Sequence, residues 1–450
     1  MLIRALSLST LVRQCSCLAP RRSMQTLDRS AIREELTVGA LVIPARRTGE
    51  FLARLRPHLL NVARTRNVAS GGAADSKKLL LARSLPTSGL EAVAAAVGGD
   101  AGAWVLGERD NVSFDTHVVT LEYDYFTAEE ALRRVLPADV ETPSSFEAAG
   151  HVAHLNLRPE HEPYKTIIGE ILLDKVATVR TVVNKVGDIE NEYRTYDLEV
   201  LAGDPDTRVE LKEQGCVFAF DVREVYWNSR LQSEHGRLLD TIPRGAVVAD
   251  CTCGVGPFSV PLSKRGIRCH ANDLNPKSVD YLRANKDRNR CGDLLDVRGP
   301  GCARDFLRTL VEEKVAVTHA IYNLPASGIG LLDAFRGLPA TPVVHCYCFA
   351  GASKGTNAKH AADVVADVRA RCAAAVGRAL PPAANEGLPL ASPDAEAAAA
   401  FVDDGLFVLR WVRNVAPNKD MYCASFRVPP PEDDASASSS SPPDAKRART

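Results

Sequence analysis

The spacing of apolar and polar residues in the second half of the chain predicts alternating strands and helices. Residues 245–250 form an apolar run that ends in an acid, and residues 257–265 have the composition of a helix that begins at a proline. A second apolar run follows at residues 267–271. Short apolar runs that end at loops are typical of buried parallel strands, and a helix between two of them is the usual crossover. The pattern therefore predicts a β-loop-α-β unit over residues 245–273.

The same alternation continues almost to the end of the chain. Upstream, residues 226–238 are expected to form a turn that runs into a helix. Downstream we expect helices at 277–286, 303–313 and from 331–335, strands at 294–297, 316–322 and 342–349, and a closing antiparallel hairpin of 407–412 with 421–426. Strands that alternate with helices predict a parallel α/β sheet. Residues 226–428 are thus predicted to form one Rossmann-like α/β domain.

Two smaller parts are predicted before it. Residues 33–136 are expected to form an α/β domain, with strands at 41–44 and 77–82 and an amphipathic helix at 50–60. Residues 146–225 are expected to form a middle α+β domain, with strands at 151–157, 178–185, 192–203 and 218–222 and a helix at 164–174. Residues 98–102 and 137–145 are interpreted as linkers, because glycine or proline interrupts the pattern there.

The two ends of the chain differ in composition from the rest. Residues 1–24 include Arg4, Arg13, Arg21 and Arg22 and no acid, which is typical of a mitochondrial transit peptide. A merely disordered terminus is the alternative. Met24 follows this leader, so a second start there predicts an additional nuclear and cytoplasmic form. Residues 429–450 are rich in proline, serine and aspartate and are expected to be disordered, and residues 381–399 are expected to be a loop insertion.

Composition excludes several classes of protein. The formal net charge of −1 does not mark the whole chain as a nucleic-acid binder, although local basic clusters remain possible sites. The 12 cysteines include no Cys-x-x-Cys pair, so neither a usual zinc site nor a disulfide scaffold is predicted. No apolar run has the length of a membrane span. An intracellular protein with reduced thiols, no metal and no membrane segment is expected.

The loop after the first predicted strand carries the first candidate chemistry. Gly254 and Gly256 form a Gly-x-Gly turn, where the absence of Cβ lets a ligand approach the backbone. Asp273 ends the second strand, where an acid can accept both ribose hydroxyls of a nucleoside. Ser259 stands where a dinucleotide fingerprint has its third glycine. S-adenosylmethionine therefore fits better than NAD. The alternative for Asp273 is a helix N-cap ahead of Asn275.

Two groups of charged residues can be interpreted either as functional sites or as ordinary surface charges. Arg230, Glu234 and Arg237 share one face of the helix expected after residue 226, where surface ion pairs are the alternative to a site. In the N-terminal part the basic residues are Arg46, Arg47, Arg54, Arg56, Arg64, Arg66, Lys77 and Lys78. They form either a solvated face or a surface that contacts phosphates.

Seven stretches occur in an order that resembles one enzyme family. They are GHVAHLNLRPEHEPYKTIIGEILLDK, TVVNKVGDIENEYRTYDLEVLAG, VYWNSRLQSEH, CGVGPFSVP, ANDLNP, YNLPA and APNKDMYC. Together they resemble the eukaryotic and archaeal tRNA (guanine-N1)-methyltransferases of the knot-free class, which act at position 37 beside the anticodon. The resemblance implies a Rossmann-like methyltransferase domain, preceded by a small N-terminal domain that grips tRNA and a middle RNA-handling domain.

The resemblance also implies roles for particular residues. Glu234 matches the general base, Arg194 an arginine that assists at the guanine, and Asn323 the asparagine of the target-base pocket. The positions implied to bind S-adenosylmethionine are Asp250, Gly254, Val255, Gly256, Asp273, Leu274, Asn323 and His235. These roles suit the chemistry, because methylation at N1 requires removal of a ring proton and stabilisation of charge on O6. Tyr226 and Trp227 are candidates to stack on the extruded base, with core packing as the alternative for Trp227.

The chain departs from the family pattern at two places. Thr252 and Cys253 stand where the family has Phe-Ala before the Gly-x-Gly turn. Cys302 lies near the position of an expected acid, and the residues alone do not decide whether Asp293 or Asp296 replaces it at the adenine.

The resemblance leaves two alternatives to methylation. One is transfer of the aminocarboxypropyl group of the same cofactor in the wybutosine pathway, and the other is a non-catalytic RNA-binding relative. The expected partner is a tRNA with guanosine at position 37, and a monomer is the family-like expectation.

Overall fold

The computed structural model describes residues 26–143, 145–187, 192–351, 358–384, 405–416 and 419–431. The chain divides into two compact units. Unit 1 contains the described residues up to 143 together with Leu157–Ala177, and unit 2 contains Ser145–Asn156 and the described residues from Thr178 onward. The expected transit peptide lies outside the described residues, as do most of the expected insertion and of the expected disordered tail. The predicted domain boundaries at 33–136, 146–225 and 226–428 stay predictions.

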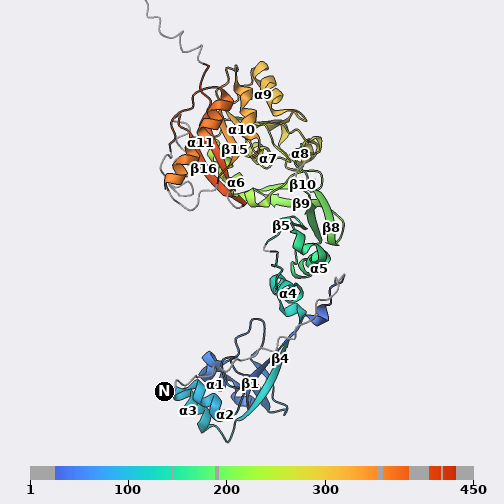
Figure 1. Ribbon diagram of the computed structural model, residues 1–450, viewed down its shortest axis with the longest axis vertical. Coiled ribbons are helices and arrows are strands. Elements are labelled where there is room, and N and C mark those ends of the chain that lie inside the picture. The colour runs from blue at the N-terminus through green and yellow to red at the C-terminus, as the bar shows by residue number, and fades with distance from the viewer. Residues whose placement is uncertain are drawn as a thin grey trace, which may run out of the picture. The chain divides into compact units, whose positions relative to one another are not determined.

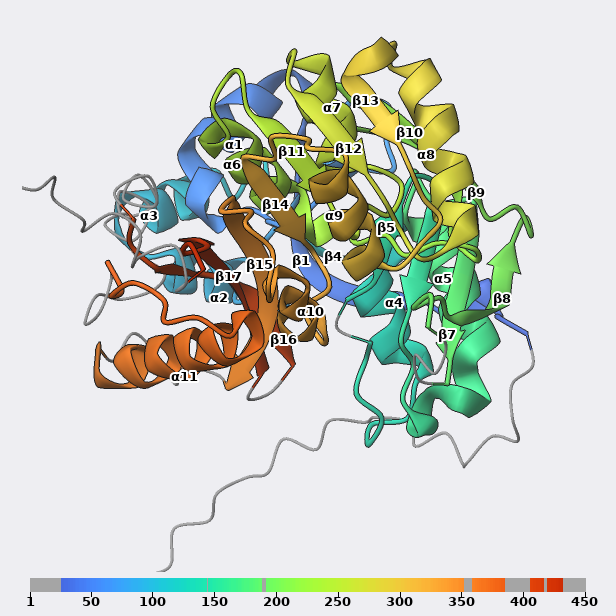
Figure 2. The ribbon, with the colours of Figure 1, turned by 90° about the horizontal axis from the view of Figure 1, so that it is seen from above.

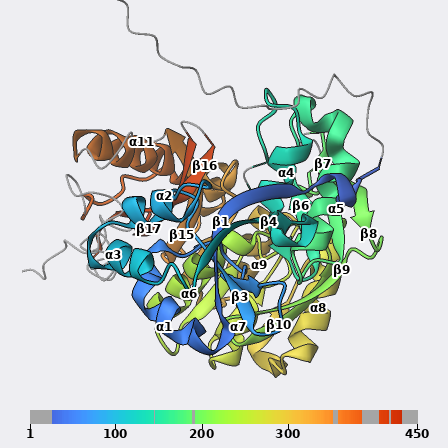
Figure 3. The same cartoon turned by 90° about the horizontal axis from the view of Figure 1, so that it is seen from below.

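Unit 1 is built on an antiparallel sheet. Its strands are β1 (Glu34–Pro44), β2 (Val68–Ser70), β3 (Ser76–Leu80) and β4 (Ser113–Leu121), in the order β2-β3-β1-β4. β1 pairs with β3 on one side and with β4 on the other, and Figure 3 shows it as a long strand next to β4. The helices are α1 (Thr48–Leu55), α2 (Leu90–Val97), α3 (Gly99–Gly107), α4 (Ala128–Val135) and α5 (Lys165–Lys175). The strands and helix expected between residues 41 and 82 are confirmed, although β1 is longer than predicted.

The prediction of a linker at residues 98–102 was wrong. Gly98 and Gly99 have positive φ angles and separate α2 from α3, but the chain resumes a helix at once. At Gly102 a Cβ would lie 2.3 Å from the Ala94 carbonyl oxygen, so this glycine permits close packing of α3 on α2. Its role is therefore packing, and the absence of a side chain was misread as a break in structure.

Unit 2 begins with two small sheets. The first contains β5 (Glu147–Ala149), β6 (Val152–Leu155), β7 (Thr181–Val186) and β8 (Asp197–Gly203), in that order. The second is an antiparallel hairpin of β9 (Arg208–Glu213) and β10 (Cys216–Asp221). The four strands expected between residues 151 and 222 are confirmed. β5 and β9 were not predicted, because one is very short and the other is mostly charged.

The larger part of unit 2 is a seven-stranded sheet in the order β13-β12-β11-β14-β15-β17-β16. Its strands are β11 (Val247–Asp250), β12 (Arg268–Ala271), β13 (Leu295–Val297), β14 (His319–Tyr322), β15 (Val343–Gly351), β16 (Val408–Ala416) and β17 (Lys419–Arg427). All are parallel except the closing β16–β17 hairpin, as predicted. The strand order reverses between β11 and β14, which is where open α/β sheets bind ligands.

Helices cover both faces of this sheet. They are α6 (Gln232–Thr241), α7 (Ser259–Lys264), α8 (Pro276–Arg288), α9 (Ala303–Glu312), α10 (Gly328–Leu331) and α11 (Ala358–Val376). Buried side chains of α6, α7 and α8 form one apolar cluster with the sheet, and those of α9 and α11 form another. Figures 1 and 2 show the strands side by side with α11 beside β15 and β16. Successive residues of a strand point to opposite faces of the sheet, so alternate side chains belong to one cluster or the other.

Two predictions in this region need correction. The helix expected from residues 331–335 begins earlier, as the short α10, and continues only as a 3-10 turn over Leu332–Phe335. The long α11 was not predicted, because its sequence is dominated by alanine and carries little contrast between faces. Among the described residues, no helix combines the length and apolar character that crossing a bilayer requires.

Candidate active site

The Gly-x-Gly turn follows β11 at the carboxyl edge of the large sheet. Gly254 has a φ of +54° and Gly256 a φ of +97°, a region of backbone conformation that side chains disfavour. A Cβ at Gly256 would lie 2.6 Å from both Leu282 Cδ1 and Val260 Cγ2. A Cβ at Gly254 would meet no atom within 4 Å. One glycine is therefore required by packing, whereas the other faces open space that a ligand can enter.

Asp273 joins the ends of two neighbouring strands. Its Oδ2 accepts the backbone N–H of Gly254 at 2.8 Å, and its Oδ1 accepts that of Asn275 at 2.9 Å. Asn275, not Asp273, is the N-cap of α8, because its side chain accepts the N–H of Lys277. The N-cap alternative for Asp273 is thus excluded. The N–H of Leu274 also acts on this carboxylate, and a carboxylate has about four acceptor positions, so it can accept a hydroxyl as well.

Asp250 is a buried acid near the hydroxyl and the backbone N–H of Ser259, both of which lower its pKa. Its side chain is fully buried at the end of β11, and among the described residues no group completes a hydrogen bond to either carboxylate oxygen. Burial, reinforced by the charge of Asp273, raises its pKa to about 7. A buried carboxylate that completes no hydrogen bond is costly, so its presence beside the glycine turn indicates a site for a polar or cationic ligand group.

The other residues expected to bind the cofactor differ in how exposed their side chains are. Leu274 is 46% exposed beside Asp273, so its side chain is available to cover an aromatic ring. Val255 is buried, and its carbonyl accepts the Asn285 side chain, so only its backbone faces the loop. His235 packs edge-on against Phe258, with its Nδ1 bonded to Glu213. His235 therefore touches the glycine loop through Phe258.

Glu234 is held by three side chains. It lies in the first turn of α6 and is only 5% exposed. Arg237 donates from Nε to Oε2 at 2.8 Å and from Nη2 to Oε1 at 2.5 Å, while the Tyr347 hydroxyl donates to Oε1 at 2.9 Å. Arg410 Nε lies 3.6 Å from Oε2. The ion pair considered from the sequence is therefore real, but it is buried and not on the surface.

The hydrogen bonds between Glu234 and Arg237 stabilise the charged forms of both side chains. Burial lowers the pKa of Arg237, but its hydrogen bonds to Glu234, together with its electrostatic interactions with Cys423, Tyr347 and Glu234, raise the pKa overall. Arg230, which was expected to share this helix face, instead donates to the Ser145 hydroxyl at 3.3 Å. A carboxylate has about four acceptor positions, and three are filled here. One acceptor position remains, on Oε2.

Asn323 lies one residue beyond the end of β14. The last register pair of β14 and β15 is Tyr322 with Cys346, so Asn323 and Tyr347 come next along their strands. Tyr347 in turn donates to Glu234, 113 residues away in sequence. Asn323 and the glycine loop thus lie at the same edge of the sheet, and Tyr347 connects that edge with Glu234.

Arg194 lies near Tyr226 and Arg413, and not among the side chains that hold Glu234. Its φ of +60° is unusual for a residue with a Cβ. It interacts electrostatically with Tyr226, as does Arg413, and Tyr226 is 44% exposed. Among the described residues no hydrogen bond or ion pair connects Arg194 with Glu234. Trp227 packs on Phe218, Phe220 and His235, which supports core packing for that ring.

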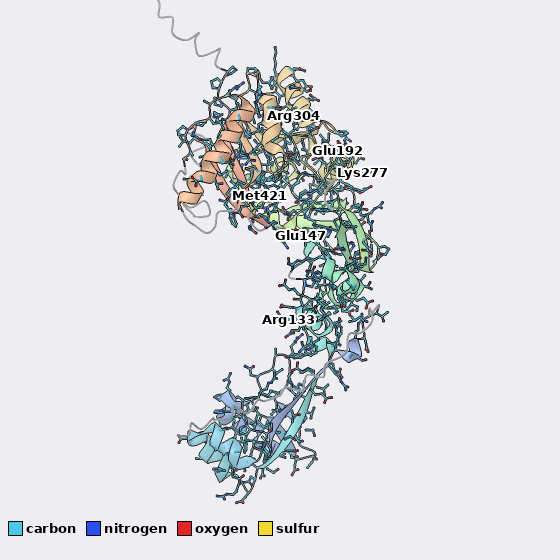
Figure 4. All side chains as sticks on the ribbon, viewed as in Figure 1. Arg133, Glu147, Glu192, Lys277, Arg304 and Met421 are labelled. Atoms are coloured by element: carbon cyan, nitrogen blue, oxygen red, sulfur yellow. The ribbon has the colours of Figure 1, made fainter. Side chains whose placement is uncertain are left out.

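Charged residues surround this exposed tyrosine. Glu147, labelled in Figure 4, pairs with Lys185 at 3.0 Å and interacts electrostatically with Tyr226. Arg413 donates to Asn228, and Asn228 donates to the Tyr226 hydroxyl at 3.2 Å. An exposed aromatic ring bordered by cations is the combination that binds an unstacked base and its phosphates.

The loop after β13 closes the cofactor side. Gly301 donates its N–H to the Asp273 carbonyl at 3.0 Å, which places Cys302 next to that acid in the fold. Asp296 is occupied, because it accepts from His270 at 2.9 Å and from Arg298 at 2.6 Å. Asp293 is exposed on the preceding turn. Both bonds are made by Oδ2 of Asp296, and no described contact holds either Asp293 or Asp296 toward Asp273.

Sequence reasoning missed three residues of the site: Tyr347, Arg410 and Asn285. Each reaches the site from a strand or helix far along the chain. Only the mostly buried β15 contained a signal, since a tyrosine in a buried strand needs a partner for its hydroxyl. Among the described residues, no group of three histidines, cysteines or acids is arranged to hold a metal.

Known proteins match this chain over most of its length. The family model of the TRM5/TYW2 methyltransferase domain matches residues 209–363, and that of the TYW2 N-terminal domain matches residues 128–207. The tRNA (guanine(37)-N(1))-methyltransferase of Phytophthora infestans is 37% identical over 418 residues, covering 90% of this chain and 93% of that protein. The protein of the same name from Drosophila melanogaster is 34% identical, covering 90% of this chain and 85% of its own length.

Solved structures show the same fold. Trm5b from Pyrococcus abyssi has a TM-score of 0.56 and 23% sequence identity, covering 87% of this chain and 99% of that chain. The structure described as the complex of aTrm5 and tRNALeu has a TM-score of 0.55 and 18% identity, with the same coverage.

Proposed function

Since this chain belongs to the family of tRNA (guanine(37)-N(1))-methyltransferases, we propose that it methylates N1 of guanosine 37 in tRNA, with Glu234 as the group that accepts the N1 proton. One observation carries the assignment of the base. Glu234 is buried at the carboxyl edge of the sheet, is connected through Tyr347 to the position of Asn323, and retains an acceptor position on Oε2.

The residues around the glycine turn fit S-adenosylmethionine. Asp250 offers a buried carboxylate, which completes no hydrogen bond within the described residues, to the amino group of its methionine part, and the backbone of Gly254 leaves space for close approach. Asp273 has lone pairs for the two ribose hydroxyls, and Leu274 can cover the adenine. When bound, S-adenosylmethionine supplies an electrophilic methyl group on a sulfonium.

The remaining residues deal with the guanine. N1 carries a proton at neutral pH, and its lone pair becomes nucleophilic only as that proton leaves. Glu234 accepts it, which typically contributes about 10²–10⁴-fold in rate. Negative charge then develops on O6, and the Arg194 guanidinium stabilises it. Asn323 can both donate and accept, so it distinguishes guanine from adenine. Tyr226 stacks on the base after it leaves the anticodon loop.

Methyl transfer to an unmodified tRNA transcript tests this function. A transcript with guanosine at position 37 should take up label from methyl-labelled cofactor, and the same transcript with adenosine at 37 should not. Mass spectrometry of the product separates a methyl group from the heavier aminocarboxypropyl group. Equal labelling of both transcripts would refute the proposed site of modification.

Glu234→Gln tests the base separately. It should leave cofactor affinity nearly unchanged and slow single-turnover methyl transfer, because an amide cannot accept the proton at comparable strength. A transfer rate equal to that of the parent would remove Glu234 from the mechanism.

The location and oligomeric state belong to the proposal as well. The arginine-rich residues 1–24 support a mitochondrial form, and a start at Met24 supports an additional nuclear and cytoplasmic form. Reporter fusions of the two products should localise differently, and identical localisation would refute the two forms. We expect a monomer, and light scattering that gives twice the mass of one chain would contradict it.

A further inference from the structure

The hydroxyl of Tyr347 makes a hydrogen bond to Glu234 in addition to the packing of its ring. Tyr347 is almost fully buried on β15, and most buried tyrosines find a partner for the hydroxyl. Here that partner is Oε1 of Glu234, at 2.9 Å, and Oε1 also accepts Arg237 Nη2 at 2.5 Å. Oε1 is therefore saturated. Oε2 accepts one hydrogen bond from Arg237 Nε and lies 3.6 Å from Arg410 Nε, which pairs with it without completing a hydrogen bond, so the remaining acceptor position of the carboxylate is on this oxygen.

The ring of Tyr347 connects the same carboxylate to the cofactor loop. It stacks on Phe258, with ring centroids 6.0 Å apart and an angle of 28° between the planes. Phe258 directly precedes α7 and is almost fully buried behind the Gly-x-Gly turn. Tyr347 thus contacts both the Phe258 ring and the Glu234 carboxylate, and it connects Glu234 with the residue that follows the loop.

We propose that Tyr347 is a positioning residue for the reaction: by occupying Oε1 while stacking on Phe258, it orients Oε2 of Glu234 as the oxygen that accepts the N1 proton. The inference rests on the proposed role of Glu234. Arg237 alone would hold the carboxylate plane, because both its bonds lie in one fork, but it does not fix the carboxylate against β15. Tyr347 fixes the carboxylate there by a hydrogen bond, from the strand next to Asn323, whereas Arg410 approaches Oε2 only at ion-pair distance.

A double-mutant cycle tests this proposal. Tyr347→Phe keeps the ring and its stacking and removes only the hydroxyl. At saturating cofactor and tRNA, it should slow single-turnover methyl transfer about tenfold, as expected for a hydrogen bond to a charged acceptor, with affinities for both substrates changed less than about twofold. In the Glu234→Gln background the same change should cause no further slowing, because a residue that acts only through Glu234 loses its effect when the base is absent.

Tyr422→Phe is the matched control. Tyr422 is fully buried on β17, which pairs with β15, and its hydroxyl lies 3.5 Å from Asp420, away from Glu234. This variant reports the cost of deleting a buried hydroxyl from the same sheet, and its methyl transfer should match that of the parent.

The outcomes separate the two proposals. Equal rates for the Tyr347→Phe variant and the parent, or a further tenfold slowing in the double variant, would overturn the positioning role. A parental rate for Glu234→Gln alone would instead overturn the proposed base. Both proposals are supported if Tyr347→Phe slows methyl transfer in the parent and causes no further slowing in the Glu234→Gln background.

Discussion

The backbone N–H of Gly254 donates a 2.8 Å hydrogen bond to Oδ2 of Asp273. This bond ties the loop after β11 to the end of β12, so the acid assigned to the ribose also holds the turn that the cofactor approaches. Burial raises the pKa of Asp273, whereas the N–H groups of Asn275 and Gly254 lower it. The carboxylate thus organises the loop before any ligand arrives, which reduces the entropy that binding must overcome.

Asp273→Ala should weaken S-adenosylmethionine binding by about 10–100-fold, because hydrogen bonds to a charged group are worth roughly 1.5–3 kcal/mol and the loop also loses its tie. Isothermal calorimetry measures the change. Asp280→Ala is the control, since Asp280 is an exposed acid on the adjacent α8. Unchanged affinity in the Asp273 variant would refute the ribose assignment.

Gly256→Ala and Gly254→Ala should separate packing from ligand contact. A methyl group at position 256 collides with Leu282 and Val260, so we expect a clear fall in the thermal unfolding midpoint. At position 254 no atom is within 4 Å, so only the backbone strain of roughly 1 kcal/mol is expected, together with weaker cofactor binding. Parental cofactor affinity in Gly254→Ala would show that the open space beside this residue is not used by the ligand.

Asp250→Asn should change how stability depends on pH. Burial and Asp273 raise the pKa of Asp250 from 3.8 to about 7, so the folded state holds a proton that the unfolded state releases. The contribution of this group to stability therefore falls as pH rises from about 4 to about 7. The Asn variant lacks this loss, so its unfolding midpoint relative to the parent should be higher at pH 8 than at pH 5.

The size of that difference is roughly 1–4 kcal/mol, since each unit of pKa corresponds to about 1.4 kcal/mol. The buried amide itself has a constant cost, so the test is the trend with pH and not the absolute midpoint. A relative midpoint that rises toward acid would contradict the raised pKa of Asp250.

Arg194→Ala should reduce chemistry more than tRNA affinity. Loss of the donor at O6 is expected to slow single-turnover methyl transfer by about 10²–10³-fold. Filter binding measures tRNA affinity in parallel, and Arg194→Lys should recover part of the rate because it retains the charge. A loss confined to affinity would identify Arg194 as a phosphate contact beside Tyr226.

The local sequence pattern predicted most strands and helices correctly, but it did not predict the structural role of the glycines at residues 98–102. The β-loop-α-β unit ending at Asp273 and the closing hairpin were predictable, because apolar runs, prolines and the spacing of turns act over a few residues. Gly98 and Gly102 were misread as a linker, because a glycine that permits helices to pack closely has the same sequence signal as one that breaks a helix. β9 was missed because its outward residues are charged.

The sequence alone determined the α/β class, the order of the strands along the chain and the family, because these depend on periodicity and on motifs that can be read without coordinates. Tertiary structure decided which side chains share the site. Tyr347 reaches Glu234 only because β15 pairs with β14, and Arg410 approaches the same carboxylate only because β16 closes the far side of the sheet. Such contacts depend on the pairing of strands distant in sequence, and a local pattern carries no information about distant partners.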